Sequence, residues 1–200
     1  SVLIDVSDGS NYASVTGLTS SNWKFTIEKA VPTSDDFIFT PPSNLVYDGS
    51  RKNARVTLKS GLSGIGSITY RYYWVNESYT GAVAPGPVYT YIVKISITEG
   101  ENFTSATDVT SEDWTFTITR ATTTVDKFTF TLPSNHVYDG TTKVATVSVN
   151  SGVSWMGDVT VKYYGSDGEQ LSSAPTDVGS YTVKIDVAQG GNYSAASDLC

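Results

Sequence analysis

The ionisable side chains of this chain lie scattered among turn-forming residues and do not make up a recognisable catalytic set. His136 is the only histidine in the 200 residues. Acid–base or nucleophilic catalysis needs a base close to a nucleophile or to a second titratable group. The other copy of an internal repeat has Leu45 at this place. We therefore predict that the protein is not an enzyme and that His136 is a partly exposed strand residue.

Aspartates recur in the predicted loops, and their carboxylates are the ligands that Ca²⁺ prefers in proteins. The dense Asp-x-Asp-x-Asp spacing of a dedicated calcium loop does not occur in the sequence. Asp35 and Asp36, beside a segment that joins two repeats, are the best candidate ligands. We expect no cofactor, and a calcium ion at these two residues is the alternative.

A group of aromatic and polar residues between positions 71 and 89 could bind a ligand. Flat aromatic rings on a β-surface stack against sugar rings or anchor a protein partner, and polar neighbours orient what binds. We interpret the group as a candidate site for a host glycan or protein, and packing of the rings against a loop or a neighbouring unit is the alternative. The candidate residues are Arg71, Trp74, Asn76, Tyr79 and Tyr89.

The chain repeats itself with a period near 90 residues. The stretch "LVYDGSRKNARVTL" at 45–58 returns as "HVYDGTTKVATVSV" at 136–149, which places Tyr47 and Tyr138 91 residues apart (138 − 47 = 91). The stretch 99–121 is matched by 8–30 at the start of the chain. A period of this length is typical of bead-like domains rather than solenoid repeats.

The repeat divides the chain into three parts, which are joined by short polar linkers after Ala30 and Ala121. Residues 1–30 are the C-terminal strands of a preceding repeat, 31–121 are a complete repeat, and 122–200 are a second repeat lacking its last strand. Alternatively, the domain boundaries run from Val2 to about Tyr91, which gives two domains and a trailing strand.

Apolar residues alternate with polar ones in short runs bounded by Gly, Pro, Asn, Asp and Ser. The run Tyr91, Val93, Ile95, Ile97 is one example, and Trp114, Phe116, Ile118 is another. Period-2 alternation predicts half-buried β-strands. Six or seven strands in each unit favour an all-β fold of tandem immunoglobulin-like β-sandwich domains. Aromatics shared between copies, such as Tyr72 and Tyr163 or Trp23 and Trp114, are expected in the core.

The repeated "VYDG" is interpreted as a structural turn. Glycine tolerates the positive φ that a tight turn demands, as at Asp48-Gly49 and Asp139-Gly140. We expect the preceding tyrosines to point their rings inward and their hydroxyls toward a backbone partner. Asn102 and Asn192 are interpreted as polar turn residues.

The order of motifs "VYDG…K", "YY", "AP…Y-x-V-x-I", "G-x-N-Y/F" and "W-x-F-x-I-x-x-A" resembles the MBG/YDG-type repeats. These repeats occur in tandem in large secreted or surface-attached bacterial proteins that are described as adhesin-like. The resemblance implies an extracellular β-rich module that serves as a stalk or adhesion segment. It implies no catalytic residues.

The remaining expectations concern partners. A net charge of −7 with only 13 scattered basic residues argues against nucleic-acid binding, and no apolar run is long enough for membrane insertion. The expected neighbours are repeats of the same protein. Because residues 1–30 carry a spare "W-x-F-x-I" strand and 122–200 lack one, strand-swapped self-association is a further expectation.

Overall fold

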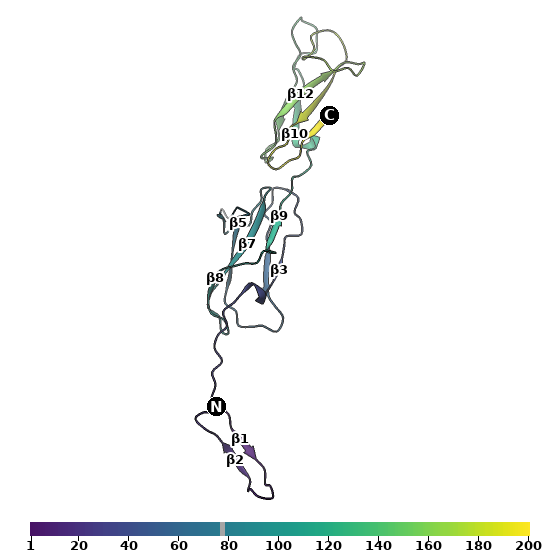
Figure 1. Cartoon of the computed structure of the whole chain (residues 1–200). Coiled ribbons are helices and arrows are strands. Elements are labelled where there is room, and N and C mark those ends of the chain that lie inside the picture. Colours follow the sequence, from purple (N-terminus) through teal and green to yellow (C-terminus); the bar gives the residue numbers. More distant parts are fainter. Residues whose placement is uncertain (77–78) are drawn as a thin grey trace.

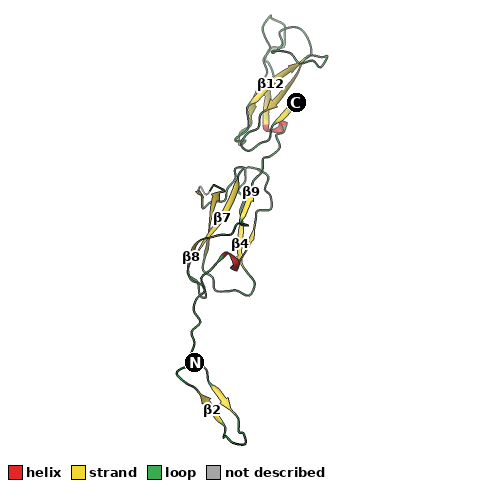
Figure 2. Cartoon of the chain, viewed as in Figure 1, coloured by secondary structure: helices red, strands yellow, loops and turns green. Residues whose placement is uncertain are grey.

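The computed structural model describes residues 1–76 and 79–200, and it is built almost wholly from antiparallel β-strands (Figure 1 and Figure 2). The helical elements of the described part are two short 3-10 turns, η1 (Ser34–Asp36) and η2 (Val125–Lys127). The all-β class predicted from the alternating sequence is confirmed. No helix in the described part is long and apolar enough to cross a membrane.

Residues 31–121, here called the middle unit, carry two antiparallel sheets. The smaller is the hairpin of β3 (Phe37–Thr40) and β4 (Arg55–Leu58). The larger has the order β6-β5-β7-β8, and β9 pairs with the first half of β7. Its strands are β5 (Ile68–Trp74), β6 (Tyr79–Gly81), β7 (Thr90–Ile97), β8 (Ala106–Val109) and β9 (Thr115–Thr117). A domain boundary at Tyr91 would cut β7 in two.

The two sheets of the middle unit pack against each other over a continuous apolar core, which gives a sandwich-like fold. Every second residue of β7 is at most 3% exposed, namely Tyr91, Val93, Ile95 and Ile97. Burial of one such side chain contributes about 1.5–3 kcal/mol. Trp114 reaches across to the smaller sheet, where its ring stacks on Phe39 with centroids 5.9 Å apart.

Residues 122–200, the last unit, repeat most of this arrangement. A hairpin of β10 (Phe128–Thr131) and β11 (Thr146–Val149) accompanies a sheet of β12 (Val159–Tyr164), β13 (Thr182–Val187) and β14 (Ala196–Leu199). The described residues of this unit include no counterpart of β9. Its separate buried cluster is correspondingly small, and contains Phe128, Ile185 and Val187.

Residues 1–30, the N-terminal segment, form a free-standing hairpin of β1 (Ile4–Val6) and β2 (Val15–Leu18), followed by an extended stretch (Figure 1). The hairpin pairs Ile4 with Leu18 through an irregular register, as β7 and β8 pair Ile95 with Val109. The expectation that Trp23 is buried is wrong, because Trp23 is 40% exposed. No sheet in the described part of the chain covers this hairpin, so Trp23 is exposed although it is the counterpart of the buried Trp114.

Candidate functional site

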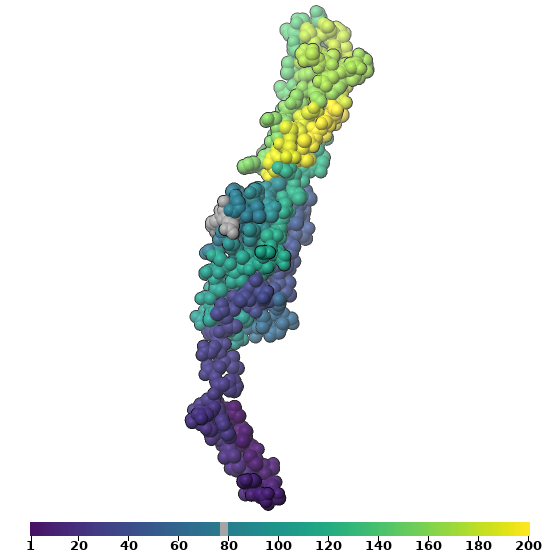
Figure 3. Space-filling view, in the orientation of Figure 1, coloured from purple at the N-terminus to yellow at the C-terminus, as the bar shows by residue number. Residues whose placement is uncertain are grey.

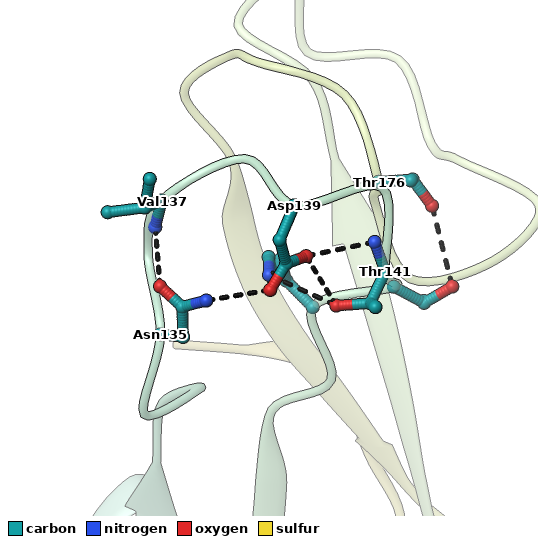
Figure 4. Close-up of polar contacts among 7 residues, drawn as sticks. Asn135, Val137, Asp139, Thr141 and Thr176 are labelled. Atoms are coloured by element: carbon teal, nitrogen blue, oxygen red, sulfur yellow. Dashed lines mark hydrogen bonds and ion pairs between the residues drawn. The ribbon is translucent and has the colours of Figure 1, made fainter.

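The repeated VYDG stretch forms a closed polar turn, shown for the last unit in Figure 4. The Asp139 carboxylate accepts hydrogen bonds from the Asn135 side-chain amide (2.7 Å) and from the backbone N–H of Thr141 (2.9 Å). The Lys143 ammonium lies 2.6 Å from the same carboxylate. In return, the Asn135 side-chain oxygen accepts the Val137 N–H at 2.9 Å. Both carboxylate oxygens of Asp139 thus accept hydrogen bonds from within the turn.

The middle unit repeats this turn around Asp48. Its carboxylate accepts from Asn44 (2.9 Å) and the Ser50 N–H (2.8 Å) and pairs with the Lys52 ammonium at 2.7 Å. Hydrogen bonds from Lys52 and then Ser50 hold the pKa of the Asp48 carboxyl well below its usual range. The Lys143 ammonium has the same effect on the pKa of Asp139. The arrangement is that of a structural turn.

Tyr47, just before the Asp48 turn, lies at the boundary between the middle and last units. Its ring is 8% exposed and meets the Tyr193 ring edge-on, with centroids 5.5 Å apart and planes at 77°. Its hydroxyl hydrogen-bonds the Ser154 hydroxyl at 3.0 Å, a side chain rather than the expected backbone partner. Tyr193 belongs to the buried cluster of the middle unit, so one apolar core continues across the boundary.

The backbone at Ala121 is bonded to the last unit. The Ala121 N–H donates to the Asn192 carbonyl at 3.0 Å, and the Ala121 carbonyl accepts the Ser194 N–H at 3.0 Å. The guanidinium of Arg120 also donates to the Gly190 carbonyl at 2.9 Å. Ala121 is therefore bound to the last unit through both its N–H and its carbonyl, so the short segment that follows it begins from a fixed position.

The same arrangement occurs at the boundary between the N-terminal segment and the middle unit. The Ala30 N–H donates to the Asn102 carbonyl at 3.0 Å, and its carbonyl accepts the Thr104 N–H at 2.9 Å. The Lys29 ammonium donates to the Gly100 carbonyl at 2.9 Å, as Arg120 does to Gly190. The junction is thus a repeated structural element of the chain.

Asn192 connects the two units through its side chain. It is 3% exposed, its amide oxygen accepts the Val88 N–H at 3.1 Å, and its amide nitrogen donates to the Ser154 carbonyl at 3.4 Å. Val88 belongs to the middle unit and Ser154 to the last. At the other junction, the Asn102 side chain donates to the Ser63 carbonyl at 3.0 Å. Asn192 therefore is a buried bridge between units.

Two of the candidate ligand-binding aromatics lie together at one end of the larger sheet. Trp74 and Tyr89 are 40% and 38% exposed, and their ring centroids are 5.2 Å apart with planes tilted by 44°. Beside them, the hydroxyl of the buried Tyr91, the cross-strand partner of Trp74, hydrogen-bonds the Trp74 indole and donates to the Pro87 carbonyl at 3.0 Å. Burial raises the pKa of Tyr91. The Trp74–Tyr89 pair thus contacts the buried Tyr91 and is partly exposed to solvent.

The other candidates are not brought to this pair. Arg71 projects from the opposite face of β5, because side chains alternate along a strand and Arg71 is three positions from Trp74. There it lies opposite Lys94 on β7 and 3.8 Å from the Asp108 carboxylate. Asn76 is exposed on the connection that follows Trp74. The side chain of Tyr79 lies outside the described residues.

Asp35 and Asp36, the candidate calcium ligands, are both in η1. The Asp36 carboxylate accepts the Thr33 N–H at 2.8 Å and the Thr33 hydroxyl at 3.2 Å, which caps the turn. Asp35 is exposed. In the part of the chain that the structure describes, no three His, Cys, Asp or Glu side chains gather closely enough to hold a metal ion.

The junction residues were missed by sequence reasoning, which interpreted Asn192 as a polar turn residue. A signal was present, since "G-x-N-F" at 100–103 and "G-x-N-Y" at 190–193 recur at the same place in each unit. No protein-family model matches the chain, and comparisons with curated proteins and with solved structures gave no match either.

Proposed function

We propose that the chain is a non-catalytic spacer: tandem immunoglobulin-like β-sandwich units of the MBG/YDG type that act as a stalk or adhesion segment of a bacterial surface protein. Its place is outside the cell, secreted or attached to the surface. The domains of this proposal are the middle and last units, preceded by the C-terminal strands of another repeat. The motif order of the sequence supports this family, and the two packed sheets of the middle unit support the architecture.

The repeated junction is the observation that carries the proposal. At Ala30 and again at Ala121, the chain leaves one unit and immediately forms two backbone hydrogen bonds with the next. A buried ring contact and a buried asparagine complete the second junction. Domains that share little surface move freely relative to each other. Units that share an apolar core and backbone hydrogen bonds keep a fixed orientation relative to each other. A spacer needs this property to hold its two ends apart.

The experiment is small-angle X-ray scattering of the chain against a variant with Gly-Gly-Ser inserted between Arg120 and Ala121. The insertion leaves both units intact but separates the docked Ala121 from the unit before it. We expect the unmodified chain to scatter as a stiff rod and the insertion variant to show a shorter mean length and a wider spread. Equal flexibility of the two chains would contradict the proposal.

A second candidate function is binding of a glycan or host protein, which the exposed Trp74–Tyr89 pair favours. Two rings fixed 5.2 Å apart offer a surface on which a sugar ring or an apolar side chain could stack. A glycan array with the unmodified chain and the Trp74→Ala/Tyr89→Ala variant tests it. Binding that the variant loses would support this function, and an array without hits from the folded chain would exclude glycans as its ligand.

A further inference from the structure

The small sheet of each unit has an outer edge whose backbone groups are not used by the hairpin. In the middle unit, the Lys59 N–H donates to the Asp36 carbonyl at 2.8 Å. These two residues flank the pair of Phe37 and Leu58, so the alternation of an antiparallel ladder makes that pair a non-hydrogen-bonded one. The same holds two residues earlier, at Val56. The N–H and C=O groups of Val56 and Leu58 therefore point outward, away from β3.

Two tyrosines of β5 cap this outer edge in the middle unit. The Tyr70 hydroxyl accepts the Val56 N–H at 3.0 Å and donates to the Val56 carbonyl at 3.2 Å. The Tyr72 hydroxyl is hydrogen-bonded to the backbone of Ala54, two residues earlier. Backbone groups that are satisfied in this way are not available to another strand.

The last unit keeps only one of these two caps. The Tyr163 hydroxyl accepts the Ala145 N–H at 3.0 Å. The place of Tyr70 is taken by Val161, 91 residues later (161 − 70 = 91), and a valine side chain has no atom that could bond the backbone. Among the described side chains, none hydrogen-bonds the backbone of Val147, which is the counterpart of the capped valine in the middle unit.

The backbone of β11 points outward in the same way as that of β4. The Asn150 N–H donates to the Lys127 carbonyl at 2.9 Å. These residues flank the pair of Phe128 and Val149, which is therefore a non-hydrogen-bonded pair. Val149 is 38% exposed. The outward N–H and C=O groups of Val147 and Val149 thus form an uncapped stretch of strand edge.

This edge is a property of the unit itself. In the middle unit no described strand lies beside β4 on its outer side, since its sheet has the order β3-β4 alone. The cap is supplied there by one side chain of β5. The difference between the two units therefore comes from a single position within each, Tyr70 in one and Val161 in the other.

The sequence around β11 also lacks the charges that keep strand edges apart. Residues 144–157 contain no Asp, Glu, Lys or Arg, in a chain whose net charge is −7. The matching residues of the middle unit, 53–66, include Arg55 and Lys59. Charged side chains, Lys above all, prevent edge strands from pairing. Two copies of this acidic chain repel each other, and an uncharged edge is the place where they can meet at least cost.

We propose that β11 of one copy of this chain pairs edge to edge with β11 of a second copy, antiparallel and around a two-fold axis at Ser148. Each Val147 then exchanges both backbone hydrogen bonds with Val149 of the other copy. The two Ser148 side chains stand directly opposite each other, and Thr146 lies opposite Asn150. These cross-strand pairs carry no charge. Because the same surface is used on both copies, the contact closes as a dimer.

The same register is blocked in the middle unit. There it would set Arg55 of one copy opposite Lys59 of the other, and like charges directly opposite each other destabilise a strand pair. It would also have to displace the Tyr70 hydroxyl from the Val56 backbone. The pairing is therefore specific to the last unit.

The pairing fixes how the two molecules lie. The strands of the last unit run along the length of the molecule, which is long and narrow, as Figure 1 and the space-filling view in Figure 3 show. Antiparallel pairing of β11 therefore sets the long axes of the two copies antiparallel. Chains held on two facing surfaces can meet in this way, which gives the stalk a homophilic adhesive contact. This consequence rests on the function proposed above, whereas the pairing itself does not.

Sedimentation velocity of the 200-residue chain tests the pairing, with Cys200→Ser to exclude disulfide dimers. Two short edges make a small interface, so we expect a monomer–dimer equilibrium with a dissociation constant of about 0.1–1 mM. Ser148→Lys sets two ammonium groups opposite each other and should raise that constant at least about tenfold. Thr57→Lys is the matched control, because it makes the same change at the equivalent place in the middle unit, and it should dimerise as the parent does.

A second variant tests the cause of the open edge. Val161→Tyr restores the cap on Val147 and should also raise the dissociation constant at least about tenfold. Hydrogen exchange locates the contact, since the Val147 and Val149 amides should gain protection between about 10 µM and about 1 mM.

The register is tested by cross-linking. In the Cys200→Ser chain, Ser148→Cys places two thiols on facing residues of a non-hydrogen-bonded pair, so mild oxidation should give disulfide-linked dimers. Thr57→Cys should give none. A chain that stays monomeric at about 1 mM, or a dimer that neither Ser148→Lys nor Val161→Tyr weakens, would overturn the proposal. Either result leaves the spacer proposal standing, because the scattering experiment reports on the Ala121 junction in dilute, monomeric chain.

Discussion

The rings of Tyr47 and Tyr193 meet edge-on across the boundary between two units, 5.5 Å apart, although 146 residues separate them in sequence (193 − 47 = 146). Tyr47 precedes the repeated turn of one unit, and Tyr193 stands in a loop of the next. Both side chains are almost fully buried, at 8% and 6% exposure, and separating the two units would expose apolar surface on each of them. The stability of the two units is therefore coupled at this contact.

Replacing Tyr47 by alanine should lower the free energy of unfolding by about 3 kcal/mol, the usual cost of removing a buried aromatic ring. Urea denaturation monitored by tryptophan fluorescence measures it. Tyr138→Ala is the matched control. Since Tyr138 is exposed, its change should stay within about 0.5 kcal/mol. Equal losses for the two tyrosines would contradict the junction.

Asn192→Ala should destabilise the chain by about 2 kcal/mol, because it removes the acceptor of the Val88 N–H from a part-buried hydrogen bond. Hydrogen exchange should report the loss locally, as faster exchange of the Val88 amide. The control is Asn102→Ala at the other junction, where the side chain is exposed and makes one hydrogen bond to Ser63. A Val88 amide that exchanges at the same rate in Asn192→Ala and the parent would refute the bridge.

Ile118→Ala should cost about 2–5 kcal/mol, since Ile118 is fully buried between β7 and the VYDG stretch. The equivalent change at the start of the chain, Ile27→Ala, should leave the melting temperature of a dilute sample unchanged, because Ile27 is 86% exposed. Thermal unfolding followed by circular dichroism compares them. A matching loss at Ile27 in dilute solution would mean that Ile27 is buried within its own chain.

The two VYDG turns should make stability sensitive to acid. The pKa of Asp48 and of Asp139 is lower in the folded than in the unfolded chain. Their contribution is therefore complete above about pH 4, the unfolded value, and is lost as the pH falls toward the lowered folded values. The Asp48→Asn/Asp139→Asn variant should show a shallower fall of melting temperature below about pH 4. An unchanged slope would show that neither turn carries this linkage.

The sequence predicted what depends on local pattern. Alternation along 91–97 reports which face of a strand is buried, and Asp-Gly pairs report turns, so the strands and the Asp48 turn could be anticipated. The alternation does not report what covers the end of a unit. Asn192 therefore looked like any turn residue, and the identical pattern around Trp23 and Trp114 could not show that one is exposed and the other buried.

The grouping of the candidate ligand-binding residues failed for a related reason. Arg71 and Trp74 are close in sequence, but an odd spacing along a strand sends their side chains to opposite faces. Trp74 and Tyr89 are far apart in sequence and adjacent in space, because β5 and β7 pair side by side. Proximity along the chain was thus a poor guide to which residues share a surface.

The most direct test of the spacer account measures the distance between the two units. Spin labels at Arg55→Cys on β4 and Ser148→Cys on β11, both exposed, report it by double electron–electron resonance, with Cys200→Ser to prevent labelling of the native cysteine. We predict one narrow distance distribution, which broadens when Gly-Gly-Ser is inserted between Arg120 and Ala121. A distribution already broad without the insertion would contradict a fixed junction and, with it, the proposal that this chain is a stiff spacer.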